Sequence, residues 1–137
     1  MPSHSIDLPA ALAGQIRREA AAAGARECCG LIEGVRDGET FRVTALHPAR
    51  NLAARADRFE IDSRDHLAAS KAARANGRGI IGCYHSHPAG RAEPSARDLA
   101  GASEENFLWL IEARGEVAAF VYLRGEFTGA DWVTSSE

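Results

Sequence analysis

The sequence contains no long hydrophobic run and no excess of positive charge. No stretch approaches the roughly 18 to 20 consecutive apolar residues that a membrane-spanning helix requires. The first residues also lack the basic-then-apolar order of a secretory signal. Sixteen basic and nineteen acidic residues give a net charge of -3, which offers no basic field for nucleic acid or anionic lipid. We therefore expect a cytoplasmic protein with neither a membrane nor a nucleic-acid partner.

Cysteine is scarce as well. The three cysteines, Cys28, Cys29 and Cys83, are odd in number, and adjacent residues such as the first two rarely reach the geometry of a mutual disulfide. All three thiols fit a reducing compartment. The 13 glycines and 5 prolines are too few for a low-complexity chain, and 137 residues with 45% hydrophobic content predict one domain over residues 1–137.

Hydrophobic periodicity predicts alternating helices and strands. Helices are expected from a cap at Asp7 to Gly24, from a cap at Asp62 or Ser63 to Gly77, and from Ser95 to about Ala102. Strands are expected over 28–35, 40–46, 58–61, 79–84, 107–112, 117–123 and, with a weaker pattern, 127–133. An Asp37-Gly38 turn makes the first two strands antiparallel, and His47-Pro48 is expected to end the second. This order predicts an α/β domain with a mixed β-sheet flanked by helices.

Two histidines follow the central strand predicted over 79–84. Because alternate side chains of an extended segment point to the same side, His85 and His87 project together. Two neutral imidazoles at this position could hold one zinc ion. A single His-x-His also occurs by chance in many proteins, so the pair alone does not establish a metal site.

The segment Ser95-x-x-Asp98 has two interpretations. Ser-x-x-Asp is an N-terminal capping box, which needs no catalytic role. Residues three apart on a helix also share a face, so Asp98 can complete a His, His, Asp ligand set. Such a set leaves the fourth tetrahedral position to water, as in catalytic zinc sites. The combined spacing of the histidines and Asp98 is more specific than either pair.

A catalytic zinc site also needs a carboxylate that takes a proton from water and passes it to a leaving amine. Glu27 is the candidate, because it lies at a predicted helix-to-strand junction where its side chain can face a cleft. Glu93 and Glu104 are interpreted as solvated surface charges.

These residues together resemble the complete motif of the JAMM (MPN+) metalloprotease family. That motif is a glutamate, then His-Ser-His, seven residues, and Ser-x-x-Asp, and every position is filled here. The Glu-Cys-Cys-Gly-Leu segment and an Arg-Phe-Glu-Ile-Asp segment that follows the loop residue Asn51 are similar to those of small stand-alone prokaryotic members.

The resemblance implies a zinc metalloprotease with the MPN/JAMM (cytidine-deaminase-like) fold. His85, His87 and Asp98 would then bind Zn²⁺. Glu27 would act as general acid/base on the zinc-bound water, and Ser95 would help to stabilise the oxyanion.

The resemblance also implies a substrate, an amide bond at the C-terminus of a ubiquitin-like (β-grasp) protein. Only 58 positions (85 minus 27) separate Glu27 from His85, and no long insertion follows Asp98. The chain thus looks like bacterial members that act on sulfur-carrier proteins, either trimming a tail beyond Gly-Gly or releasing cysteine from an adduct. The carrier tail could lie along an exposed strand edge. The alternative is a non-catalytic module that recognises such carriers. A nucleoside deaminase would require His-x-Glu and Pro-Cys-x-x-Cys, which this sequence does not contain.

Several further residues keep two interpretations. Cys28 and Cys29 are interpreted as core residues. The alternatives are a closed Cys2His2 zinc site with the two histidines, or a cysteine nucleophile. Asn51 either caps a turn or binds the substrate backbone. Trp109 is expected in the core, and Trp132 at an open sheet edge or a homodimer contact.

Overall fold

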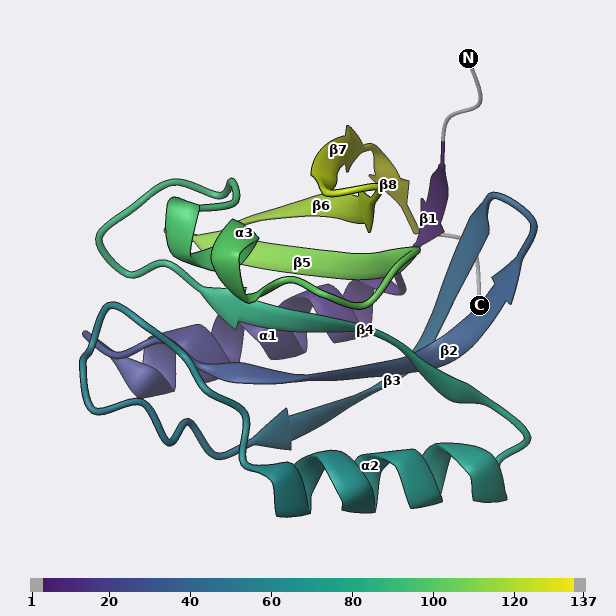
Figure 1. The fold of residues 1–137 in the computed structure, drawn as a ribbon, viewed down its shortest axis with the longest axis horizontal. Helices are drawn as coiled ribbons and strands as arrows, with labels where there is room; N and C mark the ends of the chain where they lie inside the picture. Colours follow the sequence, from purple (N-terminus) through teal and green to yellow (C-terminus); the bar gives the residue numbers. More distant parts are fainter. Residues whose placement is uncertain (1–3, 135–137) are drawn as a thin grey trace.

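The computed structural model describes residues 4–134, which form one curved sheet with helices on both of its faces (Figure 1). In chain order, the elements are β1 (Ser5–Asp7), α1 (Ala10–Ala23), β2 (Cys29–Asp37), β3 (Thr40–Ala49), α2 (Ser63–Ala75), β4 (Gly79–Ser86), α3 (Ala96–Gly101), β5 (Phe107–Ala113), β6 (Glu116–Leu123), β7 (Glu126–Ala130) and β8 (Trp132–Val133). The strand order across the sheet is β7-β6-β5-β4-β2-β3-β1-β8. Parallel pairs (β4 with β5, β1 with β3 and β8) occur beside antiparallel ones. The predicted α/β class with a mixed sheet is confirmed.

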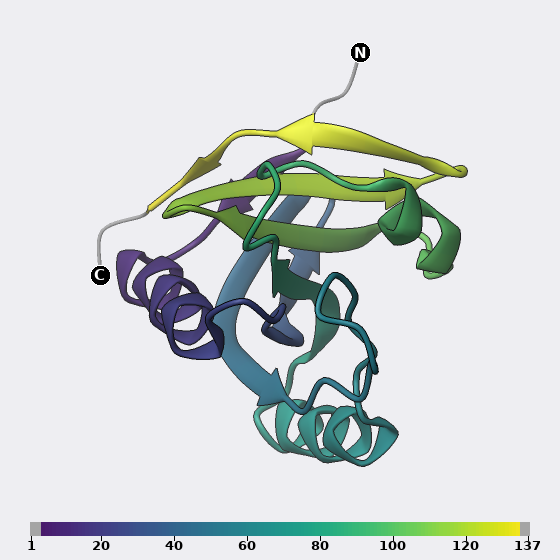
Figure 2. The same ribbon diagram turned by 90° about the vertical axis from the view of Figure 1, so that its left-hand side faces the viewer.

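The two faces of the sheet carry separate hydrophobic clusters. The cluster under α1 contains Ile16 and Ile32, both fully buried. The cluster under α2 contains Leu31, Ala69 and Trp109. Because successive side chains of a strand point to opposite faces, Leu31 and Ile32 enter different clusters. Figure 2 shows α1 and α2 on opposite sides of the strands between them. The prediction that Trp109 lies in the core is confirmed.

The last two strands connect the two edges of the sheet. β7 pairs with β6 at one edge, β8 pairs with β1 at the other, and only Asp131 separates them. The sheet is therefore curled strongly enough for one short segment to reach both edges, and Figure 2 shows this segment along the top of the view. The indole Nε1 of Trp132 donates to the carbonyl of Val117 at 2.6 Å. This position agrees with the edge-covering interpretation of Trp132, and the homodimer stays a prediction.

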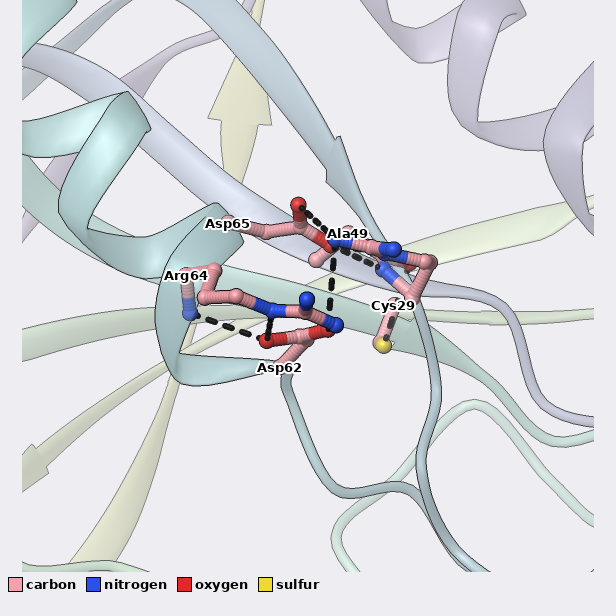
Figure 3. A network of polar contacts seen from close by, with 6 residues as sticks. Cys29, Ala49, Asp62, Arg64 and Asp65 are labelled. Carbon is pink, nitrogen blue, oxygen red and sulfur yellow. Dashed lines mark hydrogen bonds and ion pairs between the residues drawn. The ribbon is translucent and has the colours of Figure 1, made fainter.

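The start of α2 is fixed to the end of β3 by a polar network (Figure 3). Of the two predicted caps, Asp62 and Ser63, the helix uses Asp62, which accepts the backbone N–H of Arg64 at 2.9 Å. Asp65 accepts the backbone N–H of Arg50 at 2.7 Å. The side-chain hydrogen bond from Arg64 is the largest cause that lowers the pKa of Asp62 to about 2. These contacts close the ends of the loop over residues 51–61, and that loop borders the site described below.

The predicted start of the first helix is wrong. Asp7 lies in β1, and α1 begins at Ala10 after Pro9. The three residues of β1 are a strand because they pair with β3 and β8. Such pairing is a tertiary contact, and the local periodicity of hydrophobic residues cannot predict it.

Two strand predictions are wrong as well. β3 continues through His47 and Pro48 to Ala49. From Val43 onward, its strand neighbour in the described part of the chain is β2 alone, and proline is tolerated at such an edge. The strand predicted over 58–61 is reduced to a single bridge between Asn51 and Ile61. Within residues 4–134, no helix is both long and apolar enough to cross a bilayer.

Candidate metal centre and active site

His85 and His87 lie at the end of β4. This strand runs between β2 and β5, so His85 is paired with Cys29 on one side and Ile111 on the other. The pairing with β5 continues past the end of β4, because the backbone N–H of His87 donates to the carbonyl of Glu112 at 2.7 Å. The extended backbone places the two Nε2 atoms 3.0 Å apart. The exposed fraction is 0% for His85 and 8% for His87.

Asp98 reaches the same point from the first turn of α3. Ser95 is the N-cap of this helix, and its Oγ accepts the backbone N–H of Asp98 at 3.1 Å. In return, Oδ2 of Asp98 accepts the backbone N–H of Ser95 at 2.9 Å. The same oxygen lies 3.1 Å from Nε2 of His85 and 3.2 Å from Nε2 of His87. The capping box and the approach to the histidines therefore occur together.

The three side chains have the spacing and the chemistry of metal ligands. Nδ1 of His87 is hydrogen-bonded to the carbonyl of Arg91 at 2.7 Å, which places the ring proton there and leaves Nε2 with a lone pair. Tetrahedral zinc with bonds of about 2.0–2.1 Å separates neighbouring ligand atoms by roughly 3.3–3.4 Å. The separations among His85, His87 and Asp98 are 3.0–3.2 Å. Imidazole and carboxylate groups are donors that zinc accepts. The arrangement therefore fits a metal ion.

The charge states of Asp98 and His85 also suit metal binding. Burial opposes the ionisation of Asp98, but hydrogen bonds with His85 and His87 hold the pKa of its carboxyl well below the usual range. Burial lowers the pKa of His85. Burial acts in the same direction on His87, but hydrogen bonds to Asp98 and to the carbonyl of Arg91 raise its pKa overall. An ionised Asp98 beside a neutral His85 presents lone pairs, which a metal ion requires.

Glu27 lies beside the histidines, two residues before the start of β2. Its carboxylate oxygen and the ring nitrogens of His85 and His87 lie within 4.8 Å of one another, and its exposed fraction is 7%. Nδ2 of Asn51 donates to the carbonyl of Glu27 at 3.0 Å. The N–H of the next residue donates to Oγ of Ser86 at 2.9 Å. The backbone of Glu27 is thus held from the loop over residues 51–61 and from β4.

The environment of Glu27 changes its acidity. Burial raises the pKa of Glu27 to about 7, with His87 acting to lower it and Asp98 to raise it. A carboxyl group that titrates near neutral pH can both accept and release a proton under physiological conditions. The structure therefore brings together the five residues that the sequence selected, and Glu27 has the acidity expected of a general acid/base.

A cavity of about 560 Å³ opens beside this cluster, and its walls include Glu27, His87 and Ser95. Arg97 on α3 and Asp57 in the loop over residues 51–61 line the same cavity and form an ion pair, with 3.5 Å between Nη1 and Oδ2. A substrate in the cavity would therefore reach both a candidate ligand histidine and the candidate base.

The cysteines lie apart from this cluster. Cys29 and Cys83 are buried and Cys28 is half-buried, and Sγ of Cys29 contacts the carbonyl of Ala49 at 3.7 Å. Among residues 4–134, the metal-type donors grouped around the two histidines include Glu27 and no cysteine. The core interpretation holds for Cys29 but not fully for the half-buried Cys28, and the closed Cys2His2 site gains no support.

The aromatic rings around His85 were not predicted from the sequence. Phe59 stacks on this imidazole with ring centroids 4.3 Å apart, and Trp109 meets it edge-on at 5.7 Å. Cys83, two residues before His85, is paired with Trp109 on β5, so strand alternation could have indicated that contact. Phe59 comes from the loop over residues 51–61, where the strand predicted over 58–61 is only an isolated bridge, so the sequence pattern did not indicate this contact.

Comparison with known proteins places this geometry in a family. The family described as prokaryotic homologs of the JAB domain matches residues 9–126. The chain belongs to this family. The JAMM resemblance drawn from the motif is therefore confirmed, and the protein is a JAMM-type hydrolase.

Two desampylases are similar to this prokaryotic JAB domain. The one from Haloferax volcanii is 32% identical over 127 residues, which cover 91% of this chain and 90% of the relative. The one from Pyrococcus furiosus is 31% identical over 96 residues, which cover 69% of this chain and 66% of the relative.

Solved structures share the fold. The solution structure of a protein from Desulfitobacterium hafniense has a TM-score of 0.87 and 31% identity, covering 96% of this chain and 94% of the other. That of a protein from Salinibacter ruber has a TM-score of 0.71 and 32% identity, covering 96% and 91%. The prokaryotic JAB domain thus has the MPN-type fold that the motif implied.

Proposed function

We propose that the chain is a zinc-dependent peptidase or isopeptidase that hydrolyses an amide bond at the C-terminus of a ubiquitin-like (β-grasp) sulfur-carrier protein. The observation that carries this proposal is the convergence of Glu27, His85, His87 and Asp98 beside a cavity of about 560 Å³. The similarity to two desampylases supports a substrate of the ubiquitin-like class.

His85, His87 and Asp98 are the residues that would hold the metal. Zinc bound there would polarise the substrate carbonyl and lower the pKa of water from 15.7 to roughly 7. Hydrogen bonds from the ligand side chains to backbone groups keep the ligand atoms directed toward one point. His87 is tied to the carbonyl of Arg91, and Asp98 to the backbone N–H of Ser95. Such supporting contacts fix the orientation and basicity of ligands.

Glu27 is assigned the proton transfers. Its carboxylate takes a proton from the attacking water and delivers it to the nitrogen of the scissile amide. The C–N bond then breaks, the amine leaves with that proton, and the acyl carbon keeps the water oxygen. A pKa of about 7 lets Glu27 serve both halves of this cycle near neutral pH.

Ser95 is assigned the stabilisation of the oxyanion that forms on the carbonyl oxygen. Its side-chain oxygen accepts the N–H of Asp98, so the hydroxyl hydrogen can be donated into the cavity that Ser95 lines. A donor aimed at developing charge stabilises the transition state more than the ground state.

Intact mass spectrometry tests the proposal. The substrates are a Gly-Gly sulfur carrier with a short peptide extension, the same carrier with a C-terminal cysteine adduct, and a lysine isopeptide of the carrier. Each is incubated with the protein, with and without a zinc chelator, and with the Glu27→Gln variant as matched control. We expect chelator-sensitive loss of the leaving group after Gly-Gly, absent with Glu27→Gln. No cleavage of any substrate by protein that holds one zinc would refute this substrate class, and would favour the non-catalytic module if the carrier still bound.

A further inference from the structure

Among residues 4–134, no side chain or carbonyl gives the imidazole of His85 the supporting hydrogen bond that His87 has. Nδ1 of His85 is buried and finds no hydrogen-bond partner within the described residues, whereas Nδ1 of His87 is bonded to the carbonyl of Arg91. A histidine that binds a metal ordinarily donates its other ring N–H to a carboxylate, a carbonyl or a water. Within the described residues, the rings packed against His85 are the contacts left to set its orientation.

Two aromatic side chains hold the His85 ring in place. Phe59 lies nearly parallel to it, with centroids 4.3 Å apart and an interplanar angle of 23°. Trp109 meets the ring edge-on at 5.7 Å and 86°, and Phe59 and Trp109 contact each other at 6.1 Å. A stacked ring and a perpendicular ring restrict both the tilt and the rotation of the imidazole.

Phe59 lies outside any helix or strand, and hydrogen bonds of the residues next to it hold its segment in place. Asn51 does this by binding the residues on both sides of Phe59. Its Nδ2 donates to the carbonyl of Arg58 at 3.0 Å, and its Oδ1 accepts the N–H of Glu60 at 2.9 Å. Nδ2 also donates to the carbonyl of Glu27, and Oδ1 also accepts the N–H of Ala53.

These four bonds use the full capacity of an asparagine side chain, which has two donors and two acceptor lone pairs. They agree with the turn interpretation of Asn51. They also join the backbone of the candidate base to the segment that carries Phe59.

We propose that Phe59 is a positioning residue that orients His85 toward the metal, and that Asn51 holds Phe59 in place and couples it to Glu27. Stacking by Phe59 orients His85, as the hydrogen bond to the carbonyl of Arg91 orients His87. The inference rests on the metal centre of the proposed function, and it concerns how the protein prepares that centre before substrate arrives.

Metal binding by purified variants tests the role of Phe59. Phe59→Leu removes the stacked ring, and Phe59→Tyr restores a ring. Phe127→Leu is the matched control, because Phe127 packs on Trp109 at 5.0 Å in the same hydrophobic cluster. The measurements are the Zn²⁺ dissociation constant by competition with a chromophoric chelator, the visible absorption of the Co²⁺ form, and the melting temperature of the metal-free protein.

We expect Phe59→Leu to weaken Zn²⁺ binding by at least ~10-fold, the usual scale for contacts that support a ligand, and to shift the Co²⁺ spectrum. Phe59→Tyr should restore both readouts, and Phe127→Leu should leave both unchanged. Wild-type affinity and spectrum in Phe59→Leu, or equal losses in Phe127→Leu, would overturn the inference. Failure of the wild-type protein to bind Zn²⁺ would refute the metal centre itself, which keeps the two failures distinct.

A double-mutant cycle tests the role of Asn51. If Asn51 acts through Phe59, the loss of Zn²⁺ affinity in Asn51→Ala and that in Phe59→Leu should not add in the double variant. Additive losses would show that Asn51 does not position Phe59. Should Asn51→Ala fail to fold, Asn51→Asp provides the same comparison, because it keeps the acceptor oxygen toward Glu60 and loses the donors to Arg58 and Glu27.

Discussion

Ser95 and Asp98 bind each other twice, each through its side chain to the backbone N–H of the other. The Oδ2 atom of Asp98 that takes part in this exchange also faces Nε2 of both histidines. The helix that carries these residues is only six residues long, so the capping box is what fixes the direction of the carboxylate. The capping box thus both begins the helix and positions the carboxylate of a candidate ligand.

Substitution of Ser95 separates capping from catalysis. Ser95→Ala removes the cap and the hydroxyl, and we expect it to lower the free energy of unfolding by about 1 kcal/mol and kcat by ~10²-fold. Ser95→Gly also lacks the hydroxyl, but glycine at an N-cap costs only a few tenths of a kcal/mol. Urea unfolding and kcat are measured for both variants. A wild-type kcat in Ser95→Gly would leave Ser95 as a cap alone.

Glu27→Gln tests whether Glu27 is the base or a ligand. As a base, its removal should leave the metal content at one equivalent and reduce kcat by at least ~10²-fold. His87→Ala serves as the comparison, because loss of a ligand should lower the metal content as well. Both quantities are measured after dialysis against metal-free buffer. Loss of metal from Glu27→Gln would place Glu27 among the ligands, which its position within 4.8 Å of both ring nitrogens permits.

The raised pKa of Glu27 makes the stability of the metal-free protein depend on pH. Burial raises this pKa from 4.5 to about 7, so the folded protein binds the proton more tightly than the unfolded chain. The stabilisation is complete below pH 4.5 and is lost as the pH rises toward 7. The quantity to compare is the free energy of unfolding of metal-free Glu27→Gln minus that of the metal-free wild type. We expect this difference to be larger at pH 8 than at pH 4.5 by roughly 1–3 kcal/mol. Urea titrations of both proteins at these two pH values give the difference, and the same difference at both would contradict the assigned pKa.

The fold could be predicted from the sequence where local contacts determine it. The caps at Asp62 and Ser95 both hold, because each side chain bonds to the backbone of its own helix. The prediction failed where distant segments meet. β1 exists through its pairing with β3 and β8. Pro48 stays in β3 because β1 pairs only with residues 40–42 of that strand and, within the described residues, leaves an open edge beside Pro48.

The candidate site divides in the same way. His85, His87 and Asp98 could be selected because spacing along one strand and one helix turn determines which side chains share a face. The stacking of Phe59 on His85 depends on the path of a loop without regular structure. The bond from His87 to the carbonyl of Arg91 likewise depends on the local turn after β4. The spacing of residues along the sequence therefore could not predict either contact.

The thiols next to Glu27 should react slowly. Burial raises the pKa of Cys28 to about 11 and that of Cys29 to about 12, and only the thiolate is nucleophilic. At pH 8 we expect alkylation of the folded protein to be at least ~10²-fold slower than that of a free cysteine, rising about tenfold per pH unit. Timed iodoacetamide labelling with mass detection measures this, with urea-unfolded protein as the control. Fast labelling of Cys28 that abolishes turnover would instead support a cysteine nucleophile.

Gly30 is required by the packing of Tyr84 across the β2–β4 pair. The two residues are directly paired, and a Cβ atom at Gly30 would overlap the Tyr84 ring. That ring is fully buried, and its hydroxyl donates to Glu19 at 2.7 Å, so it cannot shift without losing this partly buried hydrogen bond. We expect Gly30→Ala to lower the free energy of unfolding by about 1–3 kcal/mol, the usual cost of overpacking a core.

Gly101→Ala is the matched control for this prediction, because a Cβ atom there meets no atom within 4 Å. Its free energy of unfolding should stay within about 0.5 kcal/mol of wild type. Urea denaturation of the two variants under the same conditions makes the comparison. Equal midpoints would show that Tyr84 can repack around a methyl group. In that case, the glycine in Glu-Cys-Cys-Gly would have no steric requirement, and its place three residues after Glu27 would need another explanation.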